Sequence, residues 1–413
     1  MANGLRVVTE RMPSARSIAI GVWVDVGSRD ENKDEGGFSH FIEHMMFKGT
    51  RTRSTKEIAS YLESLGGVLN AFTSREQTCF HATVLDEHLP QAVDIISDIM
   101  TNSTFSHVNM EREKRVVIEE IMEVEEAPAE MIHEHFSGCF WRGQPLGRPI
   151  LGSRKVIQSL TREKLVGYFR KHYRAGRIVI SAAGNVAHRR LLGLLEGKFS
   201  FPPGDKGRGE PPQMPDNFSL RFFRTRANQT HLSLGFPGIR FDQPERNAIL
   251  AMHTHLGGGM ASVLFQKIRE QKGIAYTVYT FVDFYHDCGV VGAYLAADRR
   301  RLSSAVDIMI REFRKTKKDR IPSLKLSQIK TQMKGNLALS MESTNTRMNR
   351  LGRHELMAGK YFDLEKSLRA IDKIKADDIV EAARRIFDHE KMTVTLLGPA
   401  GERDLKMVDW FLT

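Results

Sequence analysis

The sequence predicts two homologous α/β (α+β) domains, each a mostly antiparallel sheet with helices packed on one face. The chain has 413 residues, which is more than one ordinary hydrophobic core holds. Near its middle, at residues 201–216, a stretch rich in proline and glycine interrupts the alternation of strand-like and helix-like segments. We therefore expect a first domain at 1–200, which carries a metal site, a linker at 201–216 and a second domain without metal at 217–413.

A repeat relates the two halves. Ala92–Ile95 recurs as Ala305–Ile308, at an offset of 213 residues, and both copies lie in predicted helices that follow a pair of strands. Val179–Gly184 matches Val394–Gly398 at an offset of about 214. Two matches in the same order and context favour duplication of one domain over chance.

The first half reads as alternating strands and helices. Residues 5–9 and 17–26 alternate apolar with polar or small positions, and the short turn between them predicts a first hairpin. A polar loop at 27–37 leads into a helix, and a second helix begins at the capping pattern of residues 54–57. The remaining predicted elements are strands at 68–73 and 78–85, helices at 88–102, 107–136 and 161–173, and a strand at 177–182.

Composition excludes several classes of protein. Basic residues exceed acidic ones by 61 to 50, but they are scattered and no aromatic residues interleave them, so we expect no nucleic-acid partner. No run of about 18 apolar residues predicts a membrane span, and none of the three cysteines forms a metal-binding pair. The N-terminus lacks a secretory signal pattern, which favours a cytoplasmic protein. Whether a targeting segment was removed stays open.

Residues 40–44 read His-x-x-Glu-His in the helix that follows the polar loop. His40, Glu43 and His44 share one helical face, because they are three and four residues apart. Two imidazoles so placed can bind one zinc ion at about 2.0–2.1 Å, and the carboxylate beside them can act as a base. This inverted form of His-Glu-x-x-His is a metallopeptidase signature. The alternative is a core helix that happens to carry two histidines.

Only the first half can bind zinc in this way. At the offset of 213 the second half has His253, Leu256 and Gly257, and so lacks the glutamate and the second histidine. Catalytic zinc usually has three protein ligands, so a third must come from another element.

The acidic helical stretch at 107–136 offers candidates for the third ligand. Glu113 and Glu120 lie two turns apart on one side, near the apolar face of Val117 and Ile121. A carboxylate at the margin of an apolar face needs a partner that pairs with its charge or binds to it. The alternative is an ordinary solvated helix rich in glutamate. The pattern by itself leaves both glutamates as candidates.

With these residues the chain resembles the inverzincin metallopeptidases of the pitrilysin family, M16, and among them the short, processing-peptidase-like members (M16B). The resemblance covers nearly the whole chain and includes Asn3–Leu5, Leu69–Glu76, Pro145–Gly152 and Leu256–Met260. It implies a zinc site formed by His40, His44 and Glu120, with Glu43 as the base and Glu113 as the residue that supports the third ligand.

The resemblance also implies residues outside the metal motif. Arg269 and Tyr276 match a pair that assists at the active site of the family; the alternative is a surface arginine and a packed tyrosine. A peptide substrate would add as a strand at Asn70, Ala71 and Phe72, with Phe47 lining the adjoining side-chain pocket.

Glu130 and Glu134 match positions that receive an arginine near the cleavage point in the processing peptidases. Two carboxylates one turn apart can accept a guanidinium fork. The alternative is that both residues form an exposed helix face.

The sequence thus predicts a zinc-dependent endopeptidase that cleaves short or unfolded peptides, with a preference for basic residues near the cleaved bond. The alternative is a non-catalytic partner or peptide-binding subunit of an M16 heterodimer, against which the intact ligand set weighs. We expect a homodimer or a heterodimer with a related chain, because the chain is about half as long as the family's fused members. The natural substrate, the identity of the second chain and whether Arg269 and Tyr276 act on the partner's site stay open.

Overall fold

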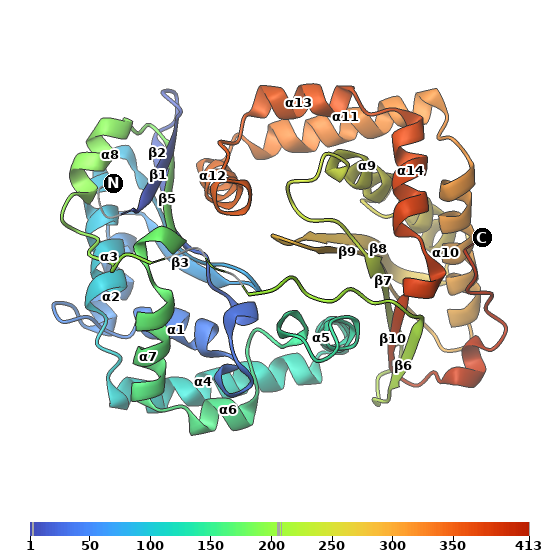
Figure 1. Ribbon diagram of the computed structural model, residues 1–413, viewed down its shortest axis with the longest axis horizontal. Helices are drawn as coiled ribbons and strands as arrows, with labels where there is room; N and C mark the ends of the chain where they lie inside the picture. Colours follow the sequence, from blue (N-terminus) through green and yellow to red (C-terminus); the bar gives the residue numbers. More distant parts are fainter. Residues whose placement is uncertain (2–3, 205–206, 208, 413) are drawn as a thin grey trace. The chain divides into compact units, whose positions relative to one another are not determined.

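The computed structural model describes residue 1, residues 4–204, residue 207 and residues 209–412 (Figure 1). Asn3 and three residues of the expected linker, Asp205, Lys206 and Arg208, lie outside the described residues. The chain forms two compact units. The first comprises Met1–Met122, Arg148–Glu210 and Ser340–Phe362, and the second comprises Glu123–Gly147, Pro211–Leu339 and Asp363–Thr413.

The first unit contains a five-stranded sheet in the order β1-β5-β2-β4-β3. Its strands are β1 (Arg6–Arg11), β2 (Ser17–Val24), β3 (Val68–Thr73), β4 (Thr78–Leu85) and β5 (Ile178–Gly184). β1 and β5 are parallel, and the other neighbours are antiparallel. The predicted hairpin of β1 and β2 is wrong, because β5 lies between them. Every residue of β5 is buried, and a strand of that kind is stable only as an interior strand.

The second unit repeats this sheet in the order β6-β10-β7-β9-β8. Its strands are β6 (Ser219–Phe223), β7 (Thr230–Pro237), β8 (Ala275–Phe284), β9 (Gly289–Ala297) and β10 (Thr393–Leu397). Only the β6–β10 pair is parallel among these described strands. The predicted fold class, two α/β halves with mostly antiparallel sheets, is confirmed.

Helices of its own half cover one face of each sheet. In the first unit, α1 (Phe38–Met46) and α3 (Leu89–Asn102) share a core with Ile18, Ile20 and Val22 of β2. In the second, Phe236 of β7 packs against Phe387, which directly follows α14 (Ala376–Ile386), with ring centroids 5.2 Å apart. The other helices are α2 (Thr55–Glu63), α4 (His107–Glu126), α6 (Arg154–Ser159), α7 (Arg162–His172), α8 (His188–Leu195), α9 (Arg246–Leu256), α10 (Leu302–Lys318), α11 (Ser323–Ser340) and α13 (Leu364–Asp372).

The opposite face of the first sheet is covered by a helix from the second half of the chain, α12 (Thr344–Ala358). Trp23 Nε1 donates to Ser181 Oγ at 2.9 Å, and this hydroxyl donates to the carbonyl of Met348 at 3.0 Å. Gly21 and Gly352 permit the close approach, because a Cβ on the first would overlap Met348 and one on the second would overlap Trp23.

The second sheet receives a helix from the first half in return. α5 (Pro128–Phe140) places Phe136 over Gly235 of β7, where a Cβ would overlap the ring. Each half of the chain therefore supplies one helix to the other half's sheet. The predicted domains 1–200 and 217–413 describe the duplicated halves and stay a prediction. The compact units differ from these ranges because residues 123–147 belong to the second unit and residues 340–362 to the first.

The long helix expected at 107–136 is two helices. Ala127, between α4 and α5, has an extended backbone (φ −97°, ψ 95°), and Pro128 begins α5. Proline has no N–H to donate within a helix but fits the first helical position. The boundary between the units lies after Met122, within α4, so Glu113 and Glu120 belong to the first unit, and Glu130 and Glu134 on α5 belong to the second. None of the helices in the described part of the chain is long and apolar enough to cross a membrane.

Candidate metal centre

The first turn of α1 is held by a buried carboxylate. Gly37, the N-cap, has the left-handed conformation (φ 93°, ψ 0°), and a Cβ there would meet the carbonyl of Leu151. Glu31 accepts hydrogen bonds from the N–H groups of Gly37 at 2.8 Å and Ser39 at 2.7 Å. It thus satisfies donors that the glycine has no side chain to cap. Burial raises the pKa of Glu31 to about 7, although the two N–H groups lower it.

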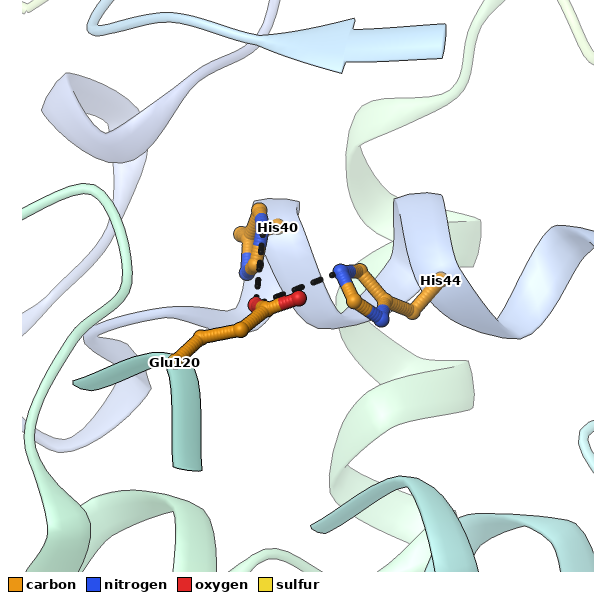
Figure 2. A group of neighbouring side chains, drawn as sticks. All are labelled: His40, His44 and Glu120. Carbon is orange, nitrogen blue, oxygen red and sulfur yellow. Dashed lines mark ion pairs between the residues drawn. The ribbon is translucent and has the colours of Figure 1, made fainter. Parts of the chain in front are cut away.

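Two histidines of α1 and a glutamate of α4 converge on one point (Figure 2). His40 Nε2 lies 3.8 Å and His44 Nε2 lies 3.6 Å from the Oε2 atom of Glu120. In the described part of the chain this is the one group of three such donors whose ligand atoms all lie within 4.8 Å of one another. Tetrahedral zinc with bonds of about 2.0–2.1 Å places its ligand atoms about 3.3–3.4 Å apart, so the set fits zinc after small side-chain movements.

Both imidazoles are suited to bind a metal ion. Burial, together with the neighbouring His44, lowers the pKa of His40 to about 3, which keeps this ring neutral. Burial alone would lower the pKa of His44, but the hydrogen bond to Glu113 and the nearby carboxylates raise it overall. Binding of a cation at His44 Nε2 would compete with protonation of the same ring.

Glu113 orients His44 from behind. It is 4% exposed, and its Oε1 accepts from His44 Nδ1 at 2.9 Å, which leaves Nε2 facing Glu120. Lys48 Nζ donates to Oε2 of the same carboxylate at 2.9 Å. Burial opposes ionisation of Glu113, but these two donors hold its pKa below the ordinary value. Glu113 contacts His44, and its predicted support of Glu120 stays a prediction.

Sequence reasoning missed Lys48. Its spacing, four residues after His44, is the only signal for it in the sequence, and Lys48 itself lies just past the C-terminal end of α1.

Glu43 points to the edge strand of the same sheet. Its Oε2 accepts a hydrogen bond from the hydroxyl of Thr73, the last residue of β3, at 2.5 Å. Burial raises the pKa of Glu43, against the opposing effect of this hydrogen bond. Sequence reasoning assigned no role to Thr73.

The predicted peptide-binding stretch lies on β3. This strand is last in the sheet order, and Asn70, Ala71 and Phe72 lie on it. Phe72 is 37% exposed, and its ring packs edge-on against Trp23 at 5.5 Å. Phe47 directly follows α1, with its ring 6.3 Å from that of Phe80 on β4. The structure therefore places these four residues in the unit that holds His40 and His44.

The remaining predicted site residues belong to the second unit. The Arg269 guanidinium lies 4.4 Å from the ring centroid of Tyr276, which is 73% exposed near the start of β8. Glu130 is exposed and Glu134 half-buried on α5. The structure brings Arg269 and Tyr276 together, and the roles of all four residues stay predictions.

The chain matches known proteins over almost all of its length. Residues 6–154 match the model of insulinase (peptidase family M16), and residues 159–333 match that of the peptidase M16 inactive domain. An uncharacterized zinc protease of Bacillus subtilis, YmxG, is 37% identical over 400 residues, which are 97% of each chain. An uncharacterized zinc protease of Rickettsia felis is 37% identical over 403 residues, 97% of this chain and 96% of its own.

Two solved structures show the same fold. A protease from Helicobacter pylori has a TM-score of 0.88 at 21% identity and covers 96% of this chain and 97% of its own. A peptidase M16 inactive domain from Pseudomonas fluorescens has a TM-score of 0.90 at 19% identity, with 97% of each chain covered. The resemblance drawn from the sequence motifs is confirmed, and with it the requirement for zinc. The chain belongs to peptidase family M16, as one of its short, pitrilysin-like zinc metallopeptidases.

Proposed function

We propose that this metallopeptidase is an endopeptidase for short or unfolded peptides, and that it works at His40, His44, Glu120 and Glu43. The observation that carries the proposal is the convergence of both imidazole Nε2 atoms and the Glu120 carboxylate, with Glu43 on the same helix as the histidines. Relatives in Bacillus and Mycobacterium that carry the name zinc protease support it.

Each residue has a separate task. Zinc bound by the three ligands would supply a Lewis acid that polarises the peptide carbonyl and makes a water molecule more acidic. Glu43 takes the proton from the attacking water and returns it to the leaving amine. Glu113, held by Lys48, keeps His44 in the tautomer whose Nε2 can bind. Tyr276 or backbone N–H groups stabilise the developing oxyanion.

The peptide would bind by strand addition to β3. Hydrogen bonds between the main chain of a peptide and an edge strand do not depend on most of the peptide's side chains. This mode of binding therefore suits a peptidase that accepts many sequences. β3 is last in the sheet order, and Asn70 and Phe72 are exposed on it, so alternate side chains of a bound peptide would lie beside them. Phe47 would line the pocket for one of them.

Replacing Glu43 by glutamine should abolish hydrolysis while zinc remains bound. The amide keeps the shape of the side chain but cannot accept the proton, so turnover of a quenched peptide should fall at least about 100-fold. Zinc content, measured by atomic emission, should equal that of the wild type. A variant that retains turnover within tenfold of wild type would rule out Glu43 as the base.

Replacing Glu120 by glutamine should weaken zinc retention, because a neutral amide is a poor ligand for a divalent cation. The measurement is zinc remaining after dialysis against a chelator. Glu119→Gln is the matched control, since Glu119 is exposed one residue away on the same helix. Equal zinc retention in the two variants would contradict the assignment of Glu120 as a ligand.

The alternative function is that of a non-catalytic or peptide-binding subunit. The intact set of His40, His44, Glu120 and Glu43 argues against it, because a subunit without catalysis has no need of a base beside its metal. Zinc content together with cleavage of a quenched peptide separates the two functions: bound zinc and peptide without any cleavage would favour the subunit.

We also propose a dimer in which Arg269 and Tyr276 act on the metal site of the other chain. Mixing Glu43→Gln chains with Tyr276→Phe chains should then restore part of the activity, because a hybrid contains one site with both an intact base and an intact tyrosine. The control mixes Glu43→Gln with the double variant Glu43→Gln/Tyr276→Phe, whose hybrids contain no intact site. Absence of recovery in verified hybrids would mean that the tyrosine acts within its own chain or has no role.

The last proposal concerns specificity. Nine glutamates occur between Glu111 and Glu134, against three basic residues, in a protein with a net charge of +11. Glu130 and Glu134 on α5 can together accept an arginine fork. We therefore expect peptides with arginine or lysine near the cleaved bond to be preferred, and this preference to weaken as salt screens the charges.

A peptide-library digest checks this preference, with the double variant Glu130→Gln/Glu134→Gln expected to lose it. Glu125→Gln/Glu126→Gln is the matched control, because it removes the same charge from the exposed end of α4. No enrichment of basic residues around cleavage sites, or equal profiles for the two double variants, would contradict the proposal.

A further inference from the structure

The strand proposed to bind the peptide also contacts the proposed base. Thr73, at the end of β3, donates its hydroxyl proton to Glu43 Oε2 at 2.5 Å. Side chains of a strand alternate between its two faces, and this places the Thr73 hydroxyl on the same face as Leu69 and Ala71, which is half-buried. Val68 and Phe72 lie on the other, exposed face. A register shift of one residue would turn this hydroxyl away from α1.

Both partners of this hydrogen bond are held on one frame. The turn after β3 is closed by Ser74 N–H, which donates to the carbonyl of Gln77 at 2.7 Å. Arg29 binds this turn through its side chain, 2.6 Å from the buried Glu76 carboxylate. The loop that contains Arg29 then continues to Glu31, which holds the first turn of α1. The separation of Thr73 and Glu43 is therefore fixed from both sides.

We propose that Thr73 is a positioning residue for hydrolysis. Its hydroxyl occupies one oxygen of the Glu43 carboxylate and so orients the other toward the water that this base deprotonates. Because Thr73 ends the strand on which the peptide would bind, the same strand positions both the peptide and the base. This inference rests on the proposed roles of Glu43 and β3.

The test is the pair Thr73→Val and Thr73→Ser. Valine keeps the shape and the strand preference of threonine but has no hydroxyl, whereas serine keeps the hydroxyl. A hydrogen bond to a charged group is lost only in the valine variant, so we expect its kcat to fall about 10- to 100-fold with KM unchanged. The serine variant should recover most of kcat.

Readouts other than activity exclude a merely structural effect. Zinc content, melting temperature and the affinity of the metal-free protein for a labelled peptide should be the same in Thr73→Val and wild type. Thr83→Val is the matched control, because Thr83 lies at the opposite end of the same hairpin, paired with Val68. In a Glu43→Gln background, Thr73→Val should cause no further loss, since the two residues act as one unit.

The outcomes separate this inference from the proposed function. Wild-type kcat in Thr73→Val, or an equal loss in Thr73→Ser, overturns the role of Thr73 and leaves Glu43 as the base. Full activity of Glu43→Gln would instead overturn the proposed function itself. A loss in Thr73→Val that appears only in KM also contradicts positioning, because it would place Thr73 in peptide binding.

Discussion

Each sheet of this protein has two faces to bury, and the helices of its own half cover only one of them. The other face is closed by a helix from the opposite half of the chain, α12 on the first sheet and α5 on the second. The contact of α12 is close, since Gly352 permits Trp23 to approach the helix backbone. The half that holds the metal site therefore depends on residues 340–362, far along the chain, for the burial of its own sheet.

The metal site depends in turn on how α1 is anchored. A helix that starts at a glycine has no capping side chain, and its first N–H groups would be left unsatisfied in a buried place. Glu31, which precedes the helix in the chain, accepts hydrogen bonds from the N–H groups of Gly37 and Ser39. The Ser39 hydroxyl in the same turn also lies 3.0 Å from the hydroxyl of Tyr168 on α7. With its start held this way, α1 presents His40, Glu43 and His44 in a fixed orientation.

Buried charge at the site is balanced locally. Glu113 is nearly inaccessible to water, and an isolated carboxylate there would be strongly disfavoured. Lys48 and His44 each donate to one of its oxygens, so it stays ionised and can hold the ring. Glu120, more exposed, faces both Nε2 atoms and is the carboxylate placed to share a cation with them. Two similar glutamates on one helix thus have different surroundings.

Features that depend on local periodicity could be predicted from the amino-acid sequence alone. The spacing of His40, Glu43 and His44 follows from the helical repeat, the two strands at 68–73 and 78–85 from the polar residues that separate them, and the duplication from a constant offset. Which surfaces meet depends on tertiary packing. β5 lies between β1 and β2, α5 and α12 are exchanged between the halves, and Thr73 donates a hydrogen bond to Glu43. A repeat of 3.6 or 2 residues indicates which side of a helix or strand is apolar. It carries no information about which distant segment will bury that side.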